Sequence, residues 1–168
     1  MARPLRIQFK GAWYHITNRG LSHRHIFQTD RDRLFFLSLF GDISDMFHVE
    51  VHAYCLMENH YHLLLHTPEE NLARSMRHLD GVYTQYYNRL NRRDGPLFKG
   101  RYKAVLINAD EHLTQVSRYI HLNPIEAGVI KRPEDYPWSS YCSYLGKRSC
   151  PQWLVLKTTL DRFGINNA

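Results

Sequence analysis

Hydrophobic and polar residues alternate with a period of two in several short segments of this chain, and this period predicts β-strands. Over residues 49–57, valine, alanine, cysteine and methionine occupy every second position, which indicates a strand. Residues 12–17 and 60–65 have the β-branched, aromatic and aliphatic composition of strands, and residues 102–107 form a fourth. Because only Glu58-Asn59 separates two of these strands, we expect an antiparallel hairpin there.

Two longer segments show helical spacing, and each follows residues that favour a helix start. Thr29 and Asp32 form a capping-box pattern ahead of a long amphipathic segment, which predicts that a first helix begins there. Thr67 is the expected N-cap of a second helix, with Pro68 in its first turn and apolar residues continuing at helical spacing to Asn91. Both helices are expected to contribute to the hydrophobic core.

A third helix is predicted to begin at Asn108 or Asp110, and one of its faces is polar. Four residues at intervals of three and four line that face: His112, Gln115, Tyr119 and Asn123. A tyrosine and an amide one turn apart are candidates to act together at a site. Asn123-Pro124-Ile125-Glu126 is also the pattern of an N-cap, a first-turn proline and a capping-box acid, so Asn123 has a second interpretation as the cap of a separate short helix.

Length and composition bound the architecture. The chain has 168 residues, of which 43% are hydrophobic and 13% aromatic, so we expect a single domain over 1–168. No apolar run approaches the roughly 20 residues of a membrane helix, and no charged-then-apolar leader precedes the first strand. The three cysteines are odd in number and lack C-x-x-C spacing. We therefore expect a cytoplasmic protein without a membrane partner.

Positive charge is concentrated in one part of the sequence. The formal net charge is +6 and the pI is about 9.3, which favours polyanionic partners. Six cations with interleaved aromatic residues lie between residues 89 and 103: Arg89, Arg92, Arg93, Lys99, Arg101 and Lys103. Cations neutralise phosphates and aromatic rings stack on unpaired bases, so this segment predicts binding of single-stranded nucleic acid. A plain solvated basic loop is the competing interpretation.

Two histidines two residues apart, His60 and His62, lie within a predicted strand. Side chains alternate faces along a strand, so the two imidazoles point the same way and can share one metal ion. Taken alone, the pair also fits a half-solvated strand face. A second pair, His23 and His25, lies in an unpatterned polar segment where a mobile surface pair is expected.

Four segments together carry a family resemblance: "LMENHYHLLL" from Leu56, "GPLFKGRYKAVLI" from Gly95, "SRYIHLNPIEAGVI" from Ser117 and "PEDYPWSSY" from Pro133. In this order they resemble the REP-associated tyrosine transposases. That family belongs to the HUH single-strand endonucleases and is related to the small insertion-sequence transposases. The likeness runs from about residue 11 to residue 144. The family usually has proline where this chain has Glu58.

The resemblance implies an α+β fold in which helices pack on a ferredoxin-like antiparallel sheet, with the paired histidines on a central strand. It implies that His60, His62 and Asn123 bind Mg²⁺ or Mn²⁺ and that Tyr119 is the nucleophile. The expected function is metal-dependent cleavage and transfer of single-stranded DNA through a 5′-phosphotyrosine intermediate. The expected partner is a hairpin-forming repeat, bound by a monomer or a homodimer. A covalent phosphodiester conserves the cleaved bond, so no nucleotide cofactor is expected, and the chain has no G-x-x-x-x-G-K-[ST] loop.

Other functions remain as alternatives. Nucleotidyl transfer through His-φ-His-φ-His, where φ is apolar, is disfavoured because Leu64 occupies the third position and the next histidine is His66. A domesticated hairpin-binding protein without turnover would not need Tyr119 and both strand histidines. Three rival nucleophiles lie on the second helix: Tyr83, Tyr86 and Tyr87. The first two fall on its apolar stripe, where a core position is expected.

Overall fold

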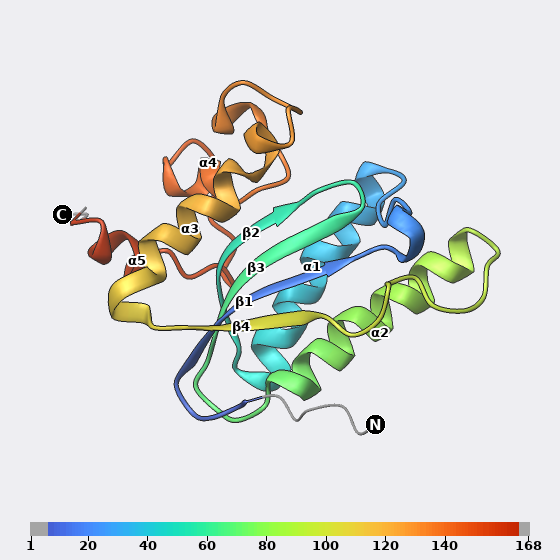
Figure 1. The fold of residues 1–168 in the computed structure, drawn as a ribbon, viewed down its shortest axis with the longest axis horizontal. Helices are drawn as coiled ribbons and strands as arrows, with labels where there is room; N and C mark the ends of the chain where they lie inside the picture. The colour runs from blue at the N-terminus through green and yellow to red at the C-terminus, as the bar shows by residue number, and fades with distance from the viewer. Residues whose placement is uncertain (1–6, 165–168) are drawn as a thin grey trace.

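The computed structural model describes residues 7–164, and its main elements follow the predicted order (Figure 1). They are β1 (Ala12–Arg19), α1 (Asp30–Phe47), β2 (Glu50–Leu56), β3 (His60–Thr67), α2 (Leu72–Leu90), β4 (Lys103–Ile107) and α3 (Ala109–Glu126). Four short helical turns complete the described part: η1 (Leu21–His23), η2 (Pro133–Asp135), α4 (Tyr141–Tyr144) and α5 (Lys157–Arg162). Within residues 7–164, no helix combines the length and the apolar character needed to cross a membrane.

The four strands form one antiparallel sheet in the order β2-β3-β1-β4. β3 therefore lies between two neighbours and carries the paired histidines, as expected. Together with the alternation of strands and helices, this order confirms the predicted α+β, ferredoxin-like fold. The hairpin between β2 and β3 is also confirmed, since the Met57 N–H donates to the His60 carbonyl at 2.9 Å.

The two faces of the sheet differ in composition because side chains alternate along each strand. On one face, Tyr61, Leu63 and Leu65 of β3 are fully buried in a core shared with α1 and α2. Phe36 of α1 and Tyr83 of α2 meet there at a ring-centroid distance of 4.8 Å, in the edge-to-face arrangement that aromatic rings favour. Figure 1 shows α1 and α2 together on this side and α3 on the other. The opposite face carries the paired histidines and a second buried apolar cluster, in which Ala53 and Leu64 of the sheet pack with Leu113 and Ile120 of α3.

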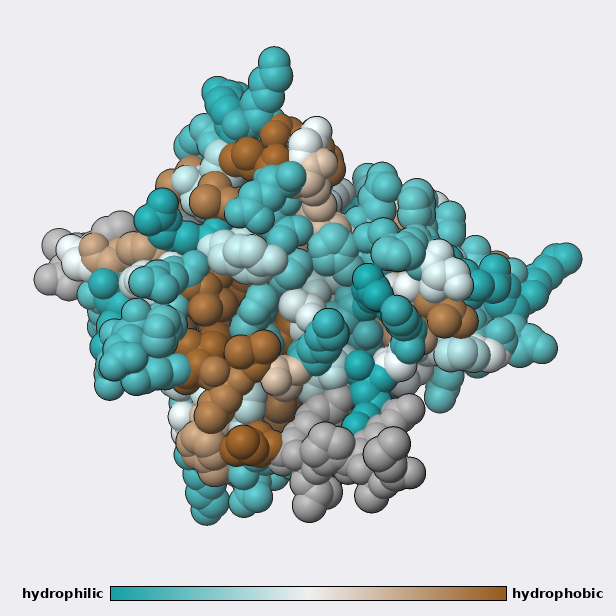
Figure 2. All heavy atoms as spheres, in the orientation of Figure 1, coloured by the Kyte–Doolittle hydropathy of each residue, from teal (hydrophilic) through white to brown (hydrophobic). Residues whose placement is uncertain are grey.

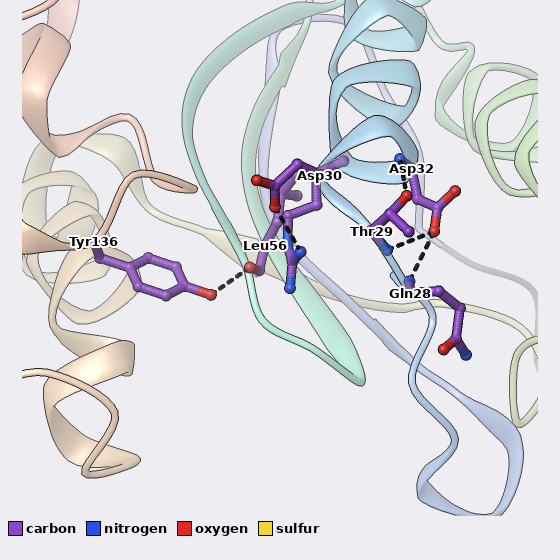
Figure 3. Close-up of polar contacts among 7 residues, drawn as sticks. Gln28, Thr29, Asp30, Asp32, Leu56 and Tyr136 are labelled. Carbon is purple, nitrogen blue, oxygen red and sulfur yellow. Dashed lines mark hydrogen bonds and ion pairs between the residues drawn. The ribbon is translucent and has the colours of Figure 1, made fainter.

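The predicted start of α1 is confirmed. The Asp32 N–H donates to the Thr29 hydroxyl at 3.4 Å, and the Asp32 carboxylate accepts from the Thr29 and Gln28 N–H groups at 2.9 and 2.8 Å (Figure 3). The side chains therefore satisfy N–H groups that the first turn cannot pair internally.

Two predicted caps are wrong. Thr67 does not begin α2, because it is the last residue of β3, where its carbonyl accepts from the Gly11 N–H at 2.8 Å. The N-cap position of α2 belongs to Asn71, whose side chain donates to the Phe47 carbonyl instead of capping the helix. Asn123 caps no separate helix either, since α3 continues through Pro124 to Glu126. Of the two predicted starts of α3, Asn108 is the N-cap, and its side chain accepts from the Asp110 N–H.

The segment after α3 ties that helix to the sheet. The Tyr136 hydroxyl donates to the Leu56 carbonyl at 2.7 Å (Figure 3), and the Ser140 N–H donates to the Tyr54 carbonyl at 3.0 Å. The Ser140 hydroxyl also lies 2.7 Å from Nε2 of the buried His121 on α3. These contacts, with the apolar cluster beneath the helix, fix α3 across the second face of the sheet, where Tyr119 then lies above β3.

Candidate functional site

His60 and His62 stand side by side at the start of β3. Their ring centroids are 5.1 Å apart, and they pair across the ladder with Arg19 and Thr17 of β1. Both therefore point to the face that α3 covers. Rigid strands hold the two imidazoles at a fixed spacing, which a metal site requires.

The hydrogen bonds of His60 leave a lone pair directed at Asn123. Burial lowers the pKa of His60, so its ring is neutral, and Nδ1 donates to the Asn59 side-chain oxygen at 2.7 Å. Its Nε2 then faces the Asn123 side-chain oxygen at 3.3 Å. Two acceptors that face each other suit a cation. Octahedral ligands at about 2.1 Å from an ion lie about 3.0 Å from their neighbours, so this spacing is compatible with a shared divalent ion.

His62 is oriented by His15, a residue that the sequence analysis missed. The two rings stack, with His15 Nε2 and His62 Nδ1 2.9 Å apart. Burial, followed by the charges of His15 and His60, lowers the pKa of His62 to about 3. The tautomer in which His62 Nδ1 donates to His15 Nε2 would leave Nε2 of the neutral His62 ring free to bind a metal. This arrangement matches the usual pattern in which a ligating histidine is held through its other nitrogen.

Tyr119 lies over the histidines and is accessible. Its ring centroid is 5.6 Å from those of both His15 and His62, in edge-on contact, and 43% of the residue is exposed. Asn123 follows one turn later on α3 and is almost fully buried, 8% exposed. Of the rival tyrosines, Tyr83 and Tyr87 are 0% and 2% exposed in the core on the far side of the sheet. Tyr119 is thus open to solvent, whereas Tyr83 and Tyr87 are not.

The cleft around Tyr119 has a volume of about 920 Å³ and is lined in part by cations. Lys99, Arg101 and Lys103 of the predicted basic segment line it, together with Arg19 and His23, which were not predicted as site residues. The Lys99 N–H donates to the Arg19 carbonyl at 2.9 Å, which brings the chain ahead of β4 alongside the end of β1.

The other half of the predicted basic segment lies elsewhere. Arg89, Arg92 and Arg93 are exposed at the C-terminal end of α2 and do not line the cleft. Figure 1 shows this end of α2 projecting away from α3. The polar face of α3 is divided in the same way, because Tyr119 and Asn123 line the cleft whereas His112 is exposed and lies 3.9 Å from Glu111. The sequence analysis therefore grouped residues into one site because they are close in sequence, but the folded chain separates them.

Comparison with known proteins agrees with this fold. The family described as "Transposase IS200 like" matches residues 8–123, which include both strand histidines, Tyr119 and Asn123. The chain is also 27% identical over 117 residues to a protein of Haemophilus influenzae assigned as a REP-associated tyrosine transposase. That match covers 63% of this chain and 66% of the relative, just under two thirds of its length.

The fold has a solved counterpart. A structure of a REP-associated tyrosine transposase bound to a REP hairpin superposes with a TM-score of 0.71, covering 92% of each chain at 16% sequence identity. This likeness concerns the fold. Because the family profile covers more than half of the sequence, the chain belongs to the IS200-like transposases, and within them it resembles the REP-associated tyrosine transposases.

Proposed function

We propose that this chain cleaves and transfers single-stranded DNA through a 5′-phosphotyrosine intermediate on Tyr119, in the presence of a divalent metal. The observation that carries the proposal is the exposed Tyr119 ring, which lies against His62 within one cleft that also holds His60 and Asn123. The rival tyrosines of α2 lie on the other side of the sheet.

In the proposed reaction, the Tyr119 hydroxyl attacks the phosphorus of a DNA phosphodiester. A bond forms between the tyrosine oxygen and phosphorus, the bond to the 3′ oxygen breaks, and that oxygen takes a proton from solvent and leaves as the 3′-hydroxyl. The tyrosine proton passes to solvent, which the 43% exposure of Tyr119 allows. Attack by a second 3′-hydroxyl reverses these steps and rejoins DNA, so no nucleotide cofactor is required.

His60, His62 and Asn123 have the nitrogen and oxygen donors that would hold Mg²⁺ or Mn²⁺. When bound, such an ion supplies Lewis-acid polarisation of a phosphate oxygen and offsets charge that develops in the transition state. The protein contributes preorganisation. Asn59 and His15 hold the two imidazoles in fixed orientations, and burial keeps both rings neutral with their lone pairs available.

The proposed substrate is a hairpin-forming repeat with a single-stranded flank. Lys99, Arg101 and Lys103 line the cleft beside Tyr119 and would bind successive phosphates of one strand. The REP hairpin bound by the structural counterpart supports the choice of a hairpin.

The direct test is formation of a covalent adduct. We expect the protein, incubated with Mn²⁺ and single-stranded hairpin oligonucleotides from the DNA flanking its gene, to yield a protein–DNA species that survives denaturing electrophoresis. Strong hairpin binding without any adduct, under Mg²⁺ or Mn²⁺, would instead identify a domesticated binding protein without turnover.

A further inference from the structure

A second group of metal-ligating side chains lies at the opposite end of β3. Glu50 of β2 pairs with His66 of β3, and His66 follows His62 by four residues on the same face. At about 3.3 Å per residue, the two positions are roughly 13 Å apart along the strand. The group comprises Glu50, His52 and His66, and none of the three lines the cleft that contains Tyr119.

His52 reaches this group from a β-bulge. Val51 pairs with Leu65 and Ala53 pairs with Leu64, so His52 is an extra residue on β2. The extra residue of a bulge has no place in the ladder, and the local bend turns its side chain. His52 is two residues from Glu50 and points to the same face, and its Nε2 lies 3.2 Å from the Glu50 carboxylate.

The three side chains converge on one point. One ligand atom from each lies within 4.8 Å of the others, and His66 Nδ1 is 2.7 Å from the same Glu50 oxygen that His52 approaches. Trp13 covers the rings, with centroid distances of 4.3 Å to His52 and 4.7 Å to His66. The His52 side chain is fully buried whereas that of Glu50 is 39% exposed, so the group opens to solvent on the carboxylate side.

One polar atom of this group is unsatisfied. Nδ1 of His52 is buried and makes no hydrogen bond. Burial lowers the pKa of His52, against smaller opposing effects of Glu50 and of the Val155 backbone, so the ring is neutral. In the hydrogen-bonded arrangement, Nε2 carries the ring proton toward Glu50 and leaves a bare lone pair on Nδ1. Binding of a cation at Nε2 would move that proton to Nδ1.

We propose that Glu50, His52 and His66 form a site for a divalent transition metal of the Zn²⁺ class, separate from the metal site of the DNA cleft. Two imidazoles and one carboxylate are a common zinc donor set, and imidazole favours such ions over Mg²⁺. The ligand atoms are His52 Nε2, His66 Nδ1 and Glu50 Oε2, and solvent supplies a fourth position. The ion would link β2 and β3 at their shared end.

The test uses Zn²⁺ itself and the whole chain with His60→Ala and His62→Ala, which removes the predicted metal pair of the cleft. We expect calorimetry to show binding of about one equivalent of Zn²⁺ and a rise in Tm on addition of the ion. His66→Asn retains a polar group near the position of Nδ1 but removes the imidazole, and it should weaken this binding at least about 100-fold.

The matched control is His78→Asn, since His78 is also partly exposed and lies 3.9 Å from a single carboxylate, that of Asp42. It should leave Zn²⁺ affinity unchanged. Co²⁺ titration gives a second measurement, because a four-coordinate Co²⁺ ion absorbs visible light. The absorption should be lost when only His66→Asn is introduced and kept when only His60→Ala is introduced. Absence of Zn²⁺ binding, or binding that His66→Asn leaves unchanged, would show that the group is only a hydrogen-bonded cluster.

Discussion

The two ends of β3 carry histidines on the same face of one sheet, yet the residues around each end suit different chemistry. At the first end, His60 and His62 meet an amide, a tyrosine and cations. At the other end, His66 shares the Glu50 carboxylate with a second histidine. The hydrogen bond from His52 is the main cause that lowers the pKa of Glu50 to about 2, so this carboxylate is ionised. The cleft end therefore suits a phosphate and the other end repels one.

The surface around the two ends differs as well. Figure 2 shows hydrophilic side chains over much of this side of the molecule, with an apolar area over the end of β4 nearest α3. Val105 and Leu106 of β4 are 60% and 43% exposed. The cations begin just before them, since Lys103 is the first residue of β4. A DNA strand is therefore expected to follow the basic side of the cleft and to avoid this apolar end of β4.

The largest expected effect comes from Tyr119→Phe, which removes one oxygen and keeps the ring. Covalent adduct and strand cleavage should fall at least about 1000-fold, because no nucleophile remains, while hairpin binding and Tm stay unchanged. Gel-based adduct assays beside thermal melts measure both. Tyr86→Phe is the control and should leave the adduct intact. Persistence of a phosphotyrosine adduct in Tyr119→Phe would move the nucleophile to another residue.

Replacing His60 and His62 with Ala should reduce metal-dependent cleavage at least about 100-fold, because the nitrogen donors of the cleft are lost. Circular dichroism should show the same fold. His66→Asn, at the other end of β3, should leave cleavage close to that of the unaltered chain. Equal loss of cleavage from the two sets of changes would mean that the two ends act as one metal centre, which would remove the distinction drawn above.

A smaller effect is expected from the cations. Replacing Lys99, Arg101 and Lys103 with Ala should lower the slope of log affinity against log salt by up to about 2, at ~0.7 per phosphate contact on single-stranded DNA. The matched triple replacement of Arg89, Arg92 and Arg93 should change the slope much less, since these residues do not line the cleft. Fluorescence anisotropy over a salt series measures both. Equal flattening by the two triples would extend the DNA path to the end of α2.

Local patterns predicted much of this molecule because they encode local structure. The period of two placed His60 and His62 on one strand face, and the helical spacing placed Tyr119 and Asn123 one turn apart. The order of strands and helices, with the family resemblance, was sufficient for the ferredoxin-like sheet. Each of these features depends on residues close together in the sequence or on a motif that is typical of a family with this fold.

The missed features depend on contacts between distant segments. The Thr67 pattern favours a cap, but pairing with β1 keeps this residue in the sheet. The pattern at Asn123 favours a new helix, but α3 continues through Pro124 to Glu126, and it does so without the one backbone bond that an N–H at position 124 would make. His15 could be assigned to His62 only once β1 was known to lie beside β3. The separation of Arg89, Arg92 and Arg93 from the cations of the cleft likewise depends on the direction in which α2 ends.

The smallest expected effect is on the pH dependence of folding stability, to which His62 and Glu50 contribute over different pH ranges. Burial lowers the pKa of His62 from 6.5 to about 3, so between these values the unfolded chain binds a proton that the folded chain does not. Folding stability therefore falls as pH drops below 6.5. Glu50 behaves differently, because its pKa is lowered from 4.5 to about 2 and its contribution is present above pH 4.5 and lost as pH falls toward 2.

His62→Gln should accordingly reduce the slope of unfolding free energy against pH between 6.5 and 4.5, by up to about 1.4 kcal/mol per pH unit for the one proton involved. Glu50→Gln should leave that interval largely unchanged and flatten the curve only below pH 4.5, where the carboxylate of the unaltered protein begins to protonate in the unfolded state. Urea denaturation at pH values from 7 down to 3 measures both curves, with Tyr86→Phe as a background variant. A His62→Gln curve parallel to that of the unaltered chain would show that the His62 ring is solvated rather than buried, and the preorganised neutral imidazole of the cleft would lose its physical basis.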